Sequence, residues 1–228
     1  MNLGRGWCRY CMGSARRVVW VFPVLLGLTG CTIVMAPKSE SEVATAAAEA
    51  PTRREVLDQR RVLVFGDITP VVAERVVREL FYLDAKSGEA IDFYLMTPGG
   101  DLKAAFTIEN AMQLLRSPVN TYAFAECNSA GAMLLAAGTG RRVAFRGSTI
   151  TIHGMNSRGK PPAQYMESVQ AYYTDFWRRR ARLPEGWLPL PKGQTHFLTA
   201  DQAREYGLVD SVLERKELPR EIAPERAR

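Results

Sequence analysis

VNTYAFAECNSAGAMLLAA, residues 119–137, runs from a buried strand directly into a helix of small residues, with Ser129 at the junction. The same step from strand to helix occurs twice before it, after VLVF at 62–65 and after IDFYLM at 91–96. Strands that alternate with helices require a mostly parallel sheet joined by right-handed crossovers. The sequence therefore predicts an α/β fold with helices flanking the sheet.

Capping residues mark where the expected helices begin. Thr69 precedes Pro70, whose missing amide is harmless in a first turn, and predicts a helix through Leu83. Asp101 predicts a helix that reaches Leu115. The remaining expected elements are strands at 142–145, 149–152 and 208–212, a long helix at 162–182, and a short helix opened by a capping box of Thr199 and Gln202.

The first 30 residues have the layout of an export signal, with arginines followed by an apolar run from Val18 to Leu28. A membrane-spanning helix needs about 20 apolar residues, and the shorter run here is typical of a signal peptide. Its end, Leu-Thr-Gly followed by Cys31, resembles a bacterial lipobox, in which cleavage precedes the cysteine and the thiol carries a lipid. An ordinary signal peptide and an uncleaved anchor are the alternatives. We expect a protein of the bacterial cell envelope, lipid-anchored and facing the periplasm or the exterior.

Composition divides the 228-residue chain into four parts. The signal peptide covers 1–30, and a flexible spacer rich in Ala, Glu, Ser and Thr covers 31–54. One folded domain is expected at 55–214 and a charged tail at 215–228. The formal net charge of the whole chain is +6, and four of its arginines lie in the expected signal peptide. Without these four arginines the rest of the chain is nearly neutral. This balance argues against a nucleic-acid partner.

The cysteines indicate neither a metal site nor a disulfide. Cys8 and Cys11 form a C-x-x-C pair, but both lie in the segment expected to be removed. With Cys31 lipidated, only Cys127 remains in the body, and we interpret it as a buried, inert thiol. No metal and no cofactor are expected.

Ser129 and His153 each follow a buried strand, and the glycine-containing segment TPGGD at 97–101 precedes them. A serine becomes a nucleophile when a nearby base removes its proton, and backbone amides must stabilise the resulting oxyanion. Sites in parallel sheets form at the carboxyl ends of strands, where all three features fall. These residues predict a serine hydrolase, although a serine that opens a helix is often only a cap and a histidine is often structural.

From Val62 to Val212 the chain resembles the proteolytic subunit family of Clp proteases, within the ClpP/crotonase fold of repeated β-β-α and βαβ units. The motifs that carry the resemblance, in order, are TPGGD (97–101), CNSAGA (127–132), TITIHG (149–154) and FLTADQAREYGLVDSV (197–212). The resemblance implies that Ser129 is the nucleophile and His153 the general base. It also implies that the amides of Gly100 and Ala130 form the oxyanion hole, and that the substrate is a peptide or an unfolded protein.

The chain departs from the family where an aspartate orients the histidine, because Thr195 stands there, followed by His196. Removing the orienting carboxylate of a triad lowers turnover by ~10⁴-fold. Thr195 itself, Asp175 or Asp201 are the candidates for orienting the imidazole, and His196 is interpreted as structural. The alternative function is a catalytically degenerate lipoprotein that binds peptides or acts as a scaffold. Acyl-CoA chemistry is less favoured because CoA is cytoplasmic.

The expected helix at 162–182 carries an aromatic stripe that includes Tyr165, Tyr172 and Phe176. The stripe packs either on its own domain or on a neighbouring subunit, and we expect self-association of the body through this helix. The arginines at its end, 178–180 and 182, are interpreted as a solvated helix terminus. An export signal separates the domain from cytoplasmic unfoldases, so no ATPase partner is expected.

Overall fold

A computed structural model describes residues 51–156 and 160–214. The expected signal peptide, the expected lipidation site at Cys31, nearly all of the expected spacer and the expected charged tail lie outside the described residues. No helix among the described residues is long and apolar enough to cross a membrane.

Seven strands form one mixed sheet, in the order β1-β2-β3-β4-β7, with β5 beside β3 and β6 beside β5. Every pairing is parallel except that of β5 with β6. β3 contacts β4 through its first half and β5 through its last residues, so the sheet divides near Ala125, which has a φ of 31°. The strands are β1 Arg61–Phe65, β2 Ile91–Thr97, β3 Val119–Asn128, β4 Arg142–Phe145, β5 Thr149–His153, β6 Thr195–Thr199 and β7 Ser211–Leu213.

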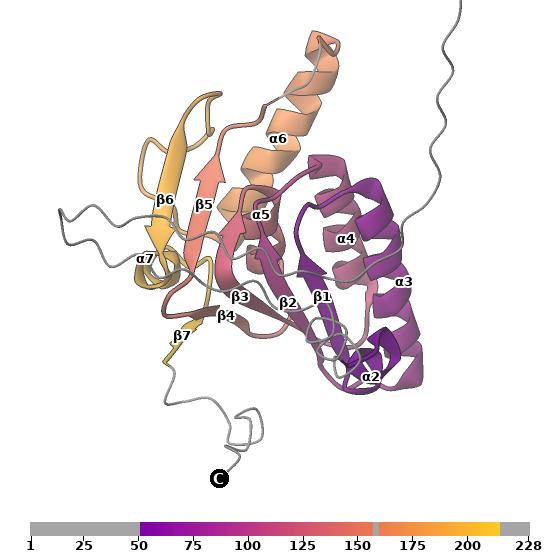
Figure 1. Ribbon diagram of the computed structural model, residues 1–228. Coiled ribbons are helices and arrows are strands. Elements are labelled where there is room, and N and C mark those ends of the chain that lie inside the picture. Colours follow the sequence, from indigo (N-terminus) through magenta and orange to yellow (C-terminus); the bar gives the residue numbers. More distant parts are fainter. Residues whose placement is uncertain (1–50, 157–159, 215–228) are drawn as a thin grey trace, which may run out of the picture. The chain divides into compact units, whose positions relative to one another are not determined.

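Six described helices flank the sheet, and α3 and α4 lie side by side over β1 and β2 (Figure 1). The core lies between these helices and the sheet, and it includes Phe93, Leu80 and Ile108. Every residue of α5 is buried, which explains why this helix is built from Ala, Gly, Met and Leu. The helices are α2 Arg53–Asp58, α3 Pro70–Lys86, α4 Leu102–Leu114, α5 Ala130–Ala136, α6 Ala163–Arg180 and α7 Ala200–Glu205.

The expected caps are confirmed. Thr69 accepts a hydrogen bond from the amide of Val72, and Asp101 accepts one from the amide of Ala104. The capping box that opens α7 is also present. Two elements were not predicted from the sequence. α2 begins at Arg53, before the expected start of the domain at 55, and β6 was not assigned.

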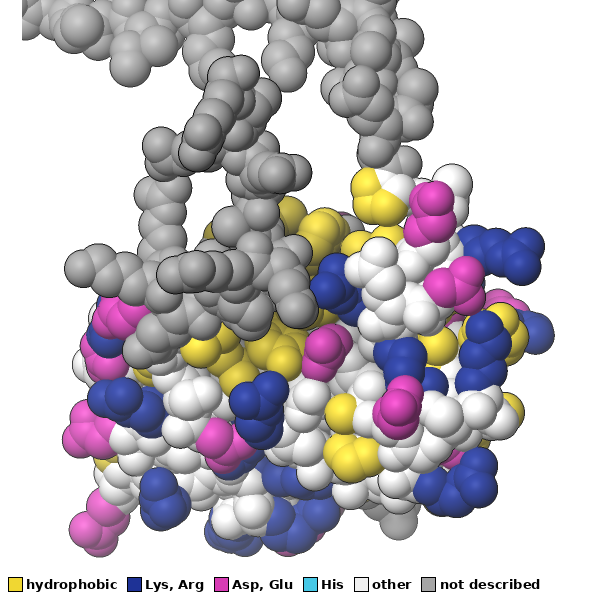
Figure 2. Space-filling model, turned by 90° about the horizontal axis from the view of Figure 1, so that it is seen from below, with side chains coloured by type: hydrophobic (Ala, Val, Ile, Leu, Met, Phe, Trp, Pro, Cys, Tyr) yellow, Lys and Arg dark blue, Asp and Glu magenta, His cyan; other side chains and the backbone are white. Residues whose placement is uncertain are grey.

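The sheet face opposite α3 and α4 carries an aromatic row. Tyr94 stacks on Tyr122 with ring centroids 4.7 Å apart, and Phe124 stacks on Phe145 at 4.5 Å. Phe65 continues the row and is 57% exposed. Hydrophobic side chains also gather in a patch on the side of the molecule seen in Figure 2, with charged side chains around it.

The aromatic stripe of α6 is divided between core and surface. Tyr173, Phe176 and Trp177 are buried in the core of the domain, so the carboxyl half of the helix packs on its own domain and the expectation of a subunit contact is wrong for Phe176. Tyr165, in the amino-terminal half, is 37% exposed. Figure 1 shows the reason, because the first turns of α6 extend beyond α4 and α5 and the last turns pack against the domain.

Candidate active site

Ser129 sits between β3 and α5 in a conformation that serine rarely adopts, with φ 56° and ψ −121°. Such a backbone costs about 1–3 kcal/mol and is typical of functional sites. Its side chain makes no capping hydrogen bond to α5, so the interpretation of Ser129 as a simple helix cap is wrong. Its amide donates to the Thr151 carbonyl at 2.7 Å, which ties the serine to β5.

The two glycines of TPGGD are required by close contacts. A Cβ at Gly99, where φ is +108°, would lie 2.6 Å from the Cβ of Ser129. A Cβ at Gly100, where φ is +146°, would lie 2.2 Å from the carbonyl oxygen of Ile68. Only glycine fits at either position, and at Gly99 the backbone lies directly against the Ser129 side chain.

The amides of Gly100 and Ala130 have no hydrogen-bond acceptor among the described residues. Ile68 bonds to the residues on either side of Gly100, through the Gly99 carbonyl and the Asp101 amide, and this leaves the Gly100 amide unused. Ala130 is the first residue of α5, where amides lack an intrahelical acceptor. The local chain thus supplies two unbonded donors, one in the glycine segment and one directly after Ser129.

His153 ends β5, the strand beside the end of β3, where Asn128 pairs with Thr151. Its Nδ1 lies 2.6 Å from the carbonyl oxygen of Gly154. A carbonyl only accepts, so this bond requires the proton on Nδ1 and leaves Nε2 of the neutral ring as a base. The hydroxyl of buried Tyr173 donates to the His153 carbonyl at 3.0 Å and fixes the backbone there.

The Ser129 hydroxyl and the His153 ring are not hydrogen-bonded to each other within the described part of the chain. Hydrogen bonds between catalytic groups are often long without substrate and shorten when it binds. The fold nevertheless places both residues at the carboxyl ends of adjacent parallel strands.

A sequence model of the Clp protease family matches residues 45–216, more than half of the chain. The chain belongs to the Clp protease family. The family resemblance read from the ordered motifs is therefore confirmed, as is the α/β fold with its mostly parallel sheet and flanking helices. The match includes every described strand and helix.

In this Clp protease family member, Thr195 lies directly across from His153 in the antiparallel pair of β5 and β6. The Gly154 amide donates to the Gln194 carbonyl at 3.0 Å, which makes His153 and Thr195 a non-hydrogen-bonded pair. Side chains in such pairs share one face, with Cα atoms about 4.5 Å apart. The Thr195 side chain is exposed, and no hydrogen bond joins it to His153 among the described residues.

The two other candidates for orienting the imidazole bind arginines instead. Asp175 pairs with Arg179 at 2.9 Å, and Asp201 bonds to Arg146 and Arg204. Within the described ranges, no carboxylate forms a hydrogen bond or an ion pair with the His153 ring. The partner that the structure gives to the imidazole is the Gly154 carbonyl, which sequence reasoning missed. In the sequence, the only local signal for this carbonyl partner is the glycine that follows the histidine in TITIHG.

His196 and Cys127 lie outside this group of residues. His196 pairs with Ile152, on the opposite face from His153, and it stacks on Trp187 with centroids 3.5 Å apart. Burial lowers the pKa of His196, as expected for a structural histidine. Cys127 is fully buried, and burial raises the pKa of its thiol, which confirms the interpretation of an inert thiol.

Proposed function

We propose that this chain is a serine peptidase in which Ser129 is the nucleophile and His153 is the general base. The observation that carries the proposal is the 2.6 Å contact between His153 Nδ1 and the Gly154 carbonyl. It fixes the tautomer in which Nε2 accepts a proton, which is the task of the orienting carboxylate in a complete triad.

In the proposed reaction the Ser129 hydroxyl oxygen attacks the substrate carbonyl while its proton moves to His153 Nε2. The tetrahedral oxyanion accepts hydrogen bonds from the amides of Gly100 and Ala130. His153 then protonates the leaving amine and the acyl-enzyme forms. Water attacks that ester, gives its proton to Nε2, and the serine is regenerated as the acid product leaves. The substrates are peptides or unfolded protein segments.

A neutral carbonyl orients the imidazole but stabilises the imidazolium less than a carboxylate does. Loss of the carboxylate from a complete triad costs ~10⁴-fold in turnover, so this site should be slow. The expected activity is slow cleavage of activated esters and of unstructured peptides.

Labelling by a fluorophosphonate probe tests this function. The wild-type chain should form a covalent adduct, and Ser129→Ala and His153→Ala should each abolish it. Ser168→Ala is the matched control, because Ser168 is an exposed serine on α6 whose hydroxyl donates to a backbone carbonyl. Equal labelling of wild type and Ser129→Ala would overturn the assignment of the nucleophile.

A catalytically degenerate member that binds peptides or acts as a scaffold is the second candidate. It is favoured by the lack of any carboxylate on the His153 ring among the described residues. Such a protein would bind unstructured peptides with an affinity that Ser129→Ala leaves unchanged, and it would take up no probe.

We further propose that the protein is anchored to a membrane of the bacterial cell envelope through a lipid on Cys31. Metabolic labelling with a palmitate analogue should mark the wild-type chain and leave Cys31→Ala unmarked, and the variant should be released or stall in processing. Cys127 remains in the variant as an internal control. Undiminished labelling of Cys31→Ala would contradict the anchor.

Self-association remains part of the proposal, restricted to the surface that α6 leaves available. Tyr165 and the other exposed residues of its first turns are the contact that we assign to a second copy. The export signal makes a cytoplasmic ATPase an unexpected partner.

A further inference from the structure

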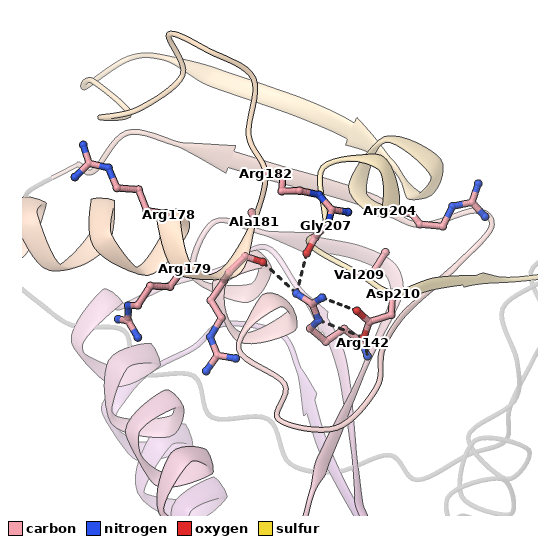
Figure 3. Close-up of a pocket in the computed structure, with 10 residues that line it drawn as sticks. Arg142, Arg178, Arg179, Ala181, Arg182, Arg204, Gly207, Val209 and Asp210 are labelled. Atoms are coloured by element: carbon pink, nitrogen blue, oxygen red, sulfur yellow. Dashed lines mark hydrogen bonds and ion pairs between the residues drawn. The ribbon is translucent and has the colours of Figure 1, made fainter.

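A cavity of about 470 Å³ lies at the carboxyl end of α6, lined by six arginines and one acidic residue, Asp210. The arginines come from separate parts of the chain, since Arg142 opens β4 and Arg204 belongs to α7. In Figure 3, Arg178 and Arg179 lie on one side of the cavity, Arg204 on the opposite side, and Arg182 between them. The arginines of this cluster are Arg142, Arg178, Arg179, Arg180, Arg182 and Arg204.

Three of the six arginines already form ion pairs with carboxylates. Arg142 binds Asp210. It also donates hydrogen bonds to two backbone carbonyls, those of Arg180 at 3.1 Å and Gly207 at 2.8 Å. Arg179 pairs with Asp175 at 2.9 Å, and Arg204 pairs with Asp201 at 3.3 Å. Arg142 therefore joins the end of α6 to the segment that follows α7.

Arg178, Arg180 and Arg182 have no side-chain hydrogen bond or ion pair among the described residues. Arg180 is half-buried, and burial lowers its pKa although Glu109 partly opposes this effect. Glu109 itself accepts a hydrogen bond from Tyr172 at 2.7 Å. A partly desolvated guanidinium without an ion pair is stabilised by any anion that reaches it.

The carboxyl end of a helix favours cations, which accounts for arginines in the last turn of α6. That effect does not account for Arg182, which follows α6, or for Arg142, which opens strand β4. The interpretation of a solvated helix terminus therefore describes only part of the cluster.

We propose that this cavity is an anion site that binds a ligand with two or more adjacent phosphate groups. A phosphate monoester carries a charge of about −1.5 to −2 near pH 7, so two such groups match three unpaired guanidinium groups better than a single carboxylate does. The planar fork of arginine pairs with phosphate oxygens in a bidentate way. The cavity volume lies within the range typical of small-molecule sites, about 300–1,000 Å³.

The anion site is independent of the proposed peptidase site. Arg142 pairs with Thr121 near the start of β3, whereas Ser129 follows the end of that strand. At about 3.3 Å per strand residue, the two sites are on the order of 25 Å apart. The proposal therefore stands or falls separately from the assignment of Ser129 and His153.

Calorimetric titration of the full-length chain with pyrophosphate and tripolyphosphate, at about 150 mM salt, tests the site. The double variant Arg178→Gln/Arg182→Gln should weaken saturable binding by about tenfold or more, because two charge-assisted contacts are lost. Arg54→Gln/Arg78→Gln is the matched control, since it removes two equally charged, exposed arginines elsewhere and should leave binding unchanged.

A flotation assay distinguishes a free ligand from a lipid headgroup. Vesicles that contain cardiolipin, whose headgroup holds two phosphate groups, are compared with vesicles of phosphatidylcholine alone, with Cys31→Ala in every chain so that no lipid anchor contributes. Binding of cardiolipin that depends on Arg178 and Arg182 would support the site with a headgroup as ligand, and binding of pyrophosphate alone would support it with a free ligand. The proposal is overturned if no arm shows saturable binding, or if the control variant loses as much affinity as the double variant. It is also overturned if polyglutamate of matched charge binds as tightly as the phosphate ligands.

Discussion

Replacing Thr195 by aspartate is expected to raise the rate of activated-ester cleavage by at least about tenfold, with ~10⁴-fold as the limit for a fully restored triad. Thr195 shares a face with His153 in a non-hydrogen-bonded pair, so an aspartate there starts within reach of the imidazole. A carboxylate would stabilise the imidazolium of the transition state, which the Gly154 carbonyl does only weakly.

The pH profile separates this effect from a general change in the protein. A neighbouring carboxylate raises the pKa of a histidine, so the rising limb of kcat/KM should move to higher pH in Thr195→Asp. Rates are therefore compared on the pH-independent plateau of each profile. Phe197→Asp is the control, because Phe197 is exposed on the same strand and pairs with Thr151 instead of His153. An equal gain in both variants, or none in Thr195→Asp, would contradict the alignment of Thr195 with the orienting position.

Trp177→Ala is expected to lower the free energy of unfolding by about 3–5 kcal/mol, the cost of truncating a large buried aromatic residue. Trp177 is fully buried and packs edge-on against Tyr173 and Phe176, with centroids 5.9 and 5.1 Å apart. Small domains are stable by about 5–15 kcal/mol, so the loss is a large part of the total. Urea denaturation measures it.

Tyr165→Ala on the same helix provides the comparison. Tyr165 is partly exposed and contacts Lys103, whose ammonium lies 4.8 Å from the ring centroid, so its loss should cost about 1 kcal/mol or less. If both variants lower the free energy of unfolding by a similar small amount, the carboxyl half of the stripe would be assigned to a subunit interface instead of the core. The two substitutions thus locate the boundary between core and surface along α6.

The elements that could be predicted from the sequence are those stabilised by local signals. Thr69 and Asp101 cap helices through hydrogen bonds to residues three positions ahead, and such caps can be recognised in a short stretch of sequence. β6 lacks a local signal, because Leu198 is its only buried residue and Phe197 is exposed. It is held as a strand by pairing with β5, more than 40 residues earlier in the chain.

The same distinction applies to the functional residues. Ser129, His153 and the glycine segment could be predicted because their side chains, or the lack of one, are unusual at the ends of strands. The partner of the imidazole could not, because it is a main-chain carbonyl and every residue has one. The arginine cluster was recognised only along α6, since Arg142 and Arg204 join it through the fold.

Because the Gly154 amide bonds to Gln194, the ability of His153 to act as a base depends on the edge of the sheet. The Gly154 carbonyl sets the tautomer of His153, and the Gly154 amide bonds to Gln194, the residue just before β6, a five-residue strand with one buried side chain. For a strand with so little buried surface, the free energy of local opening is lower than the free energy of unfolding of the whole domain. Warming should therefore inactivate the protein while most of its amides remain protected from hydrogen exchange, and the Gly154 amide should be among the first to exchange.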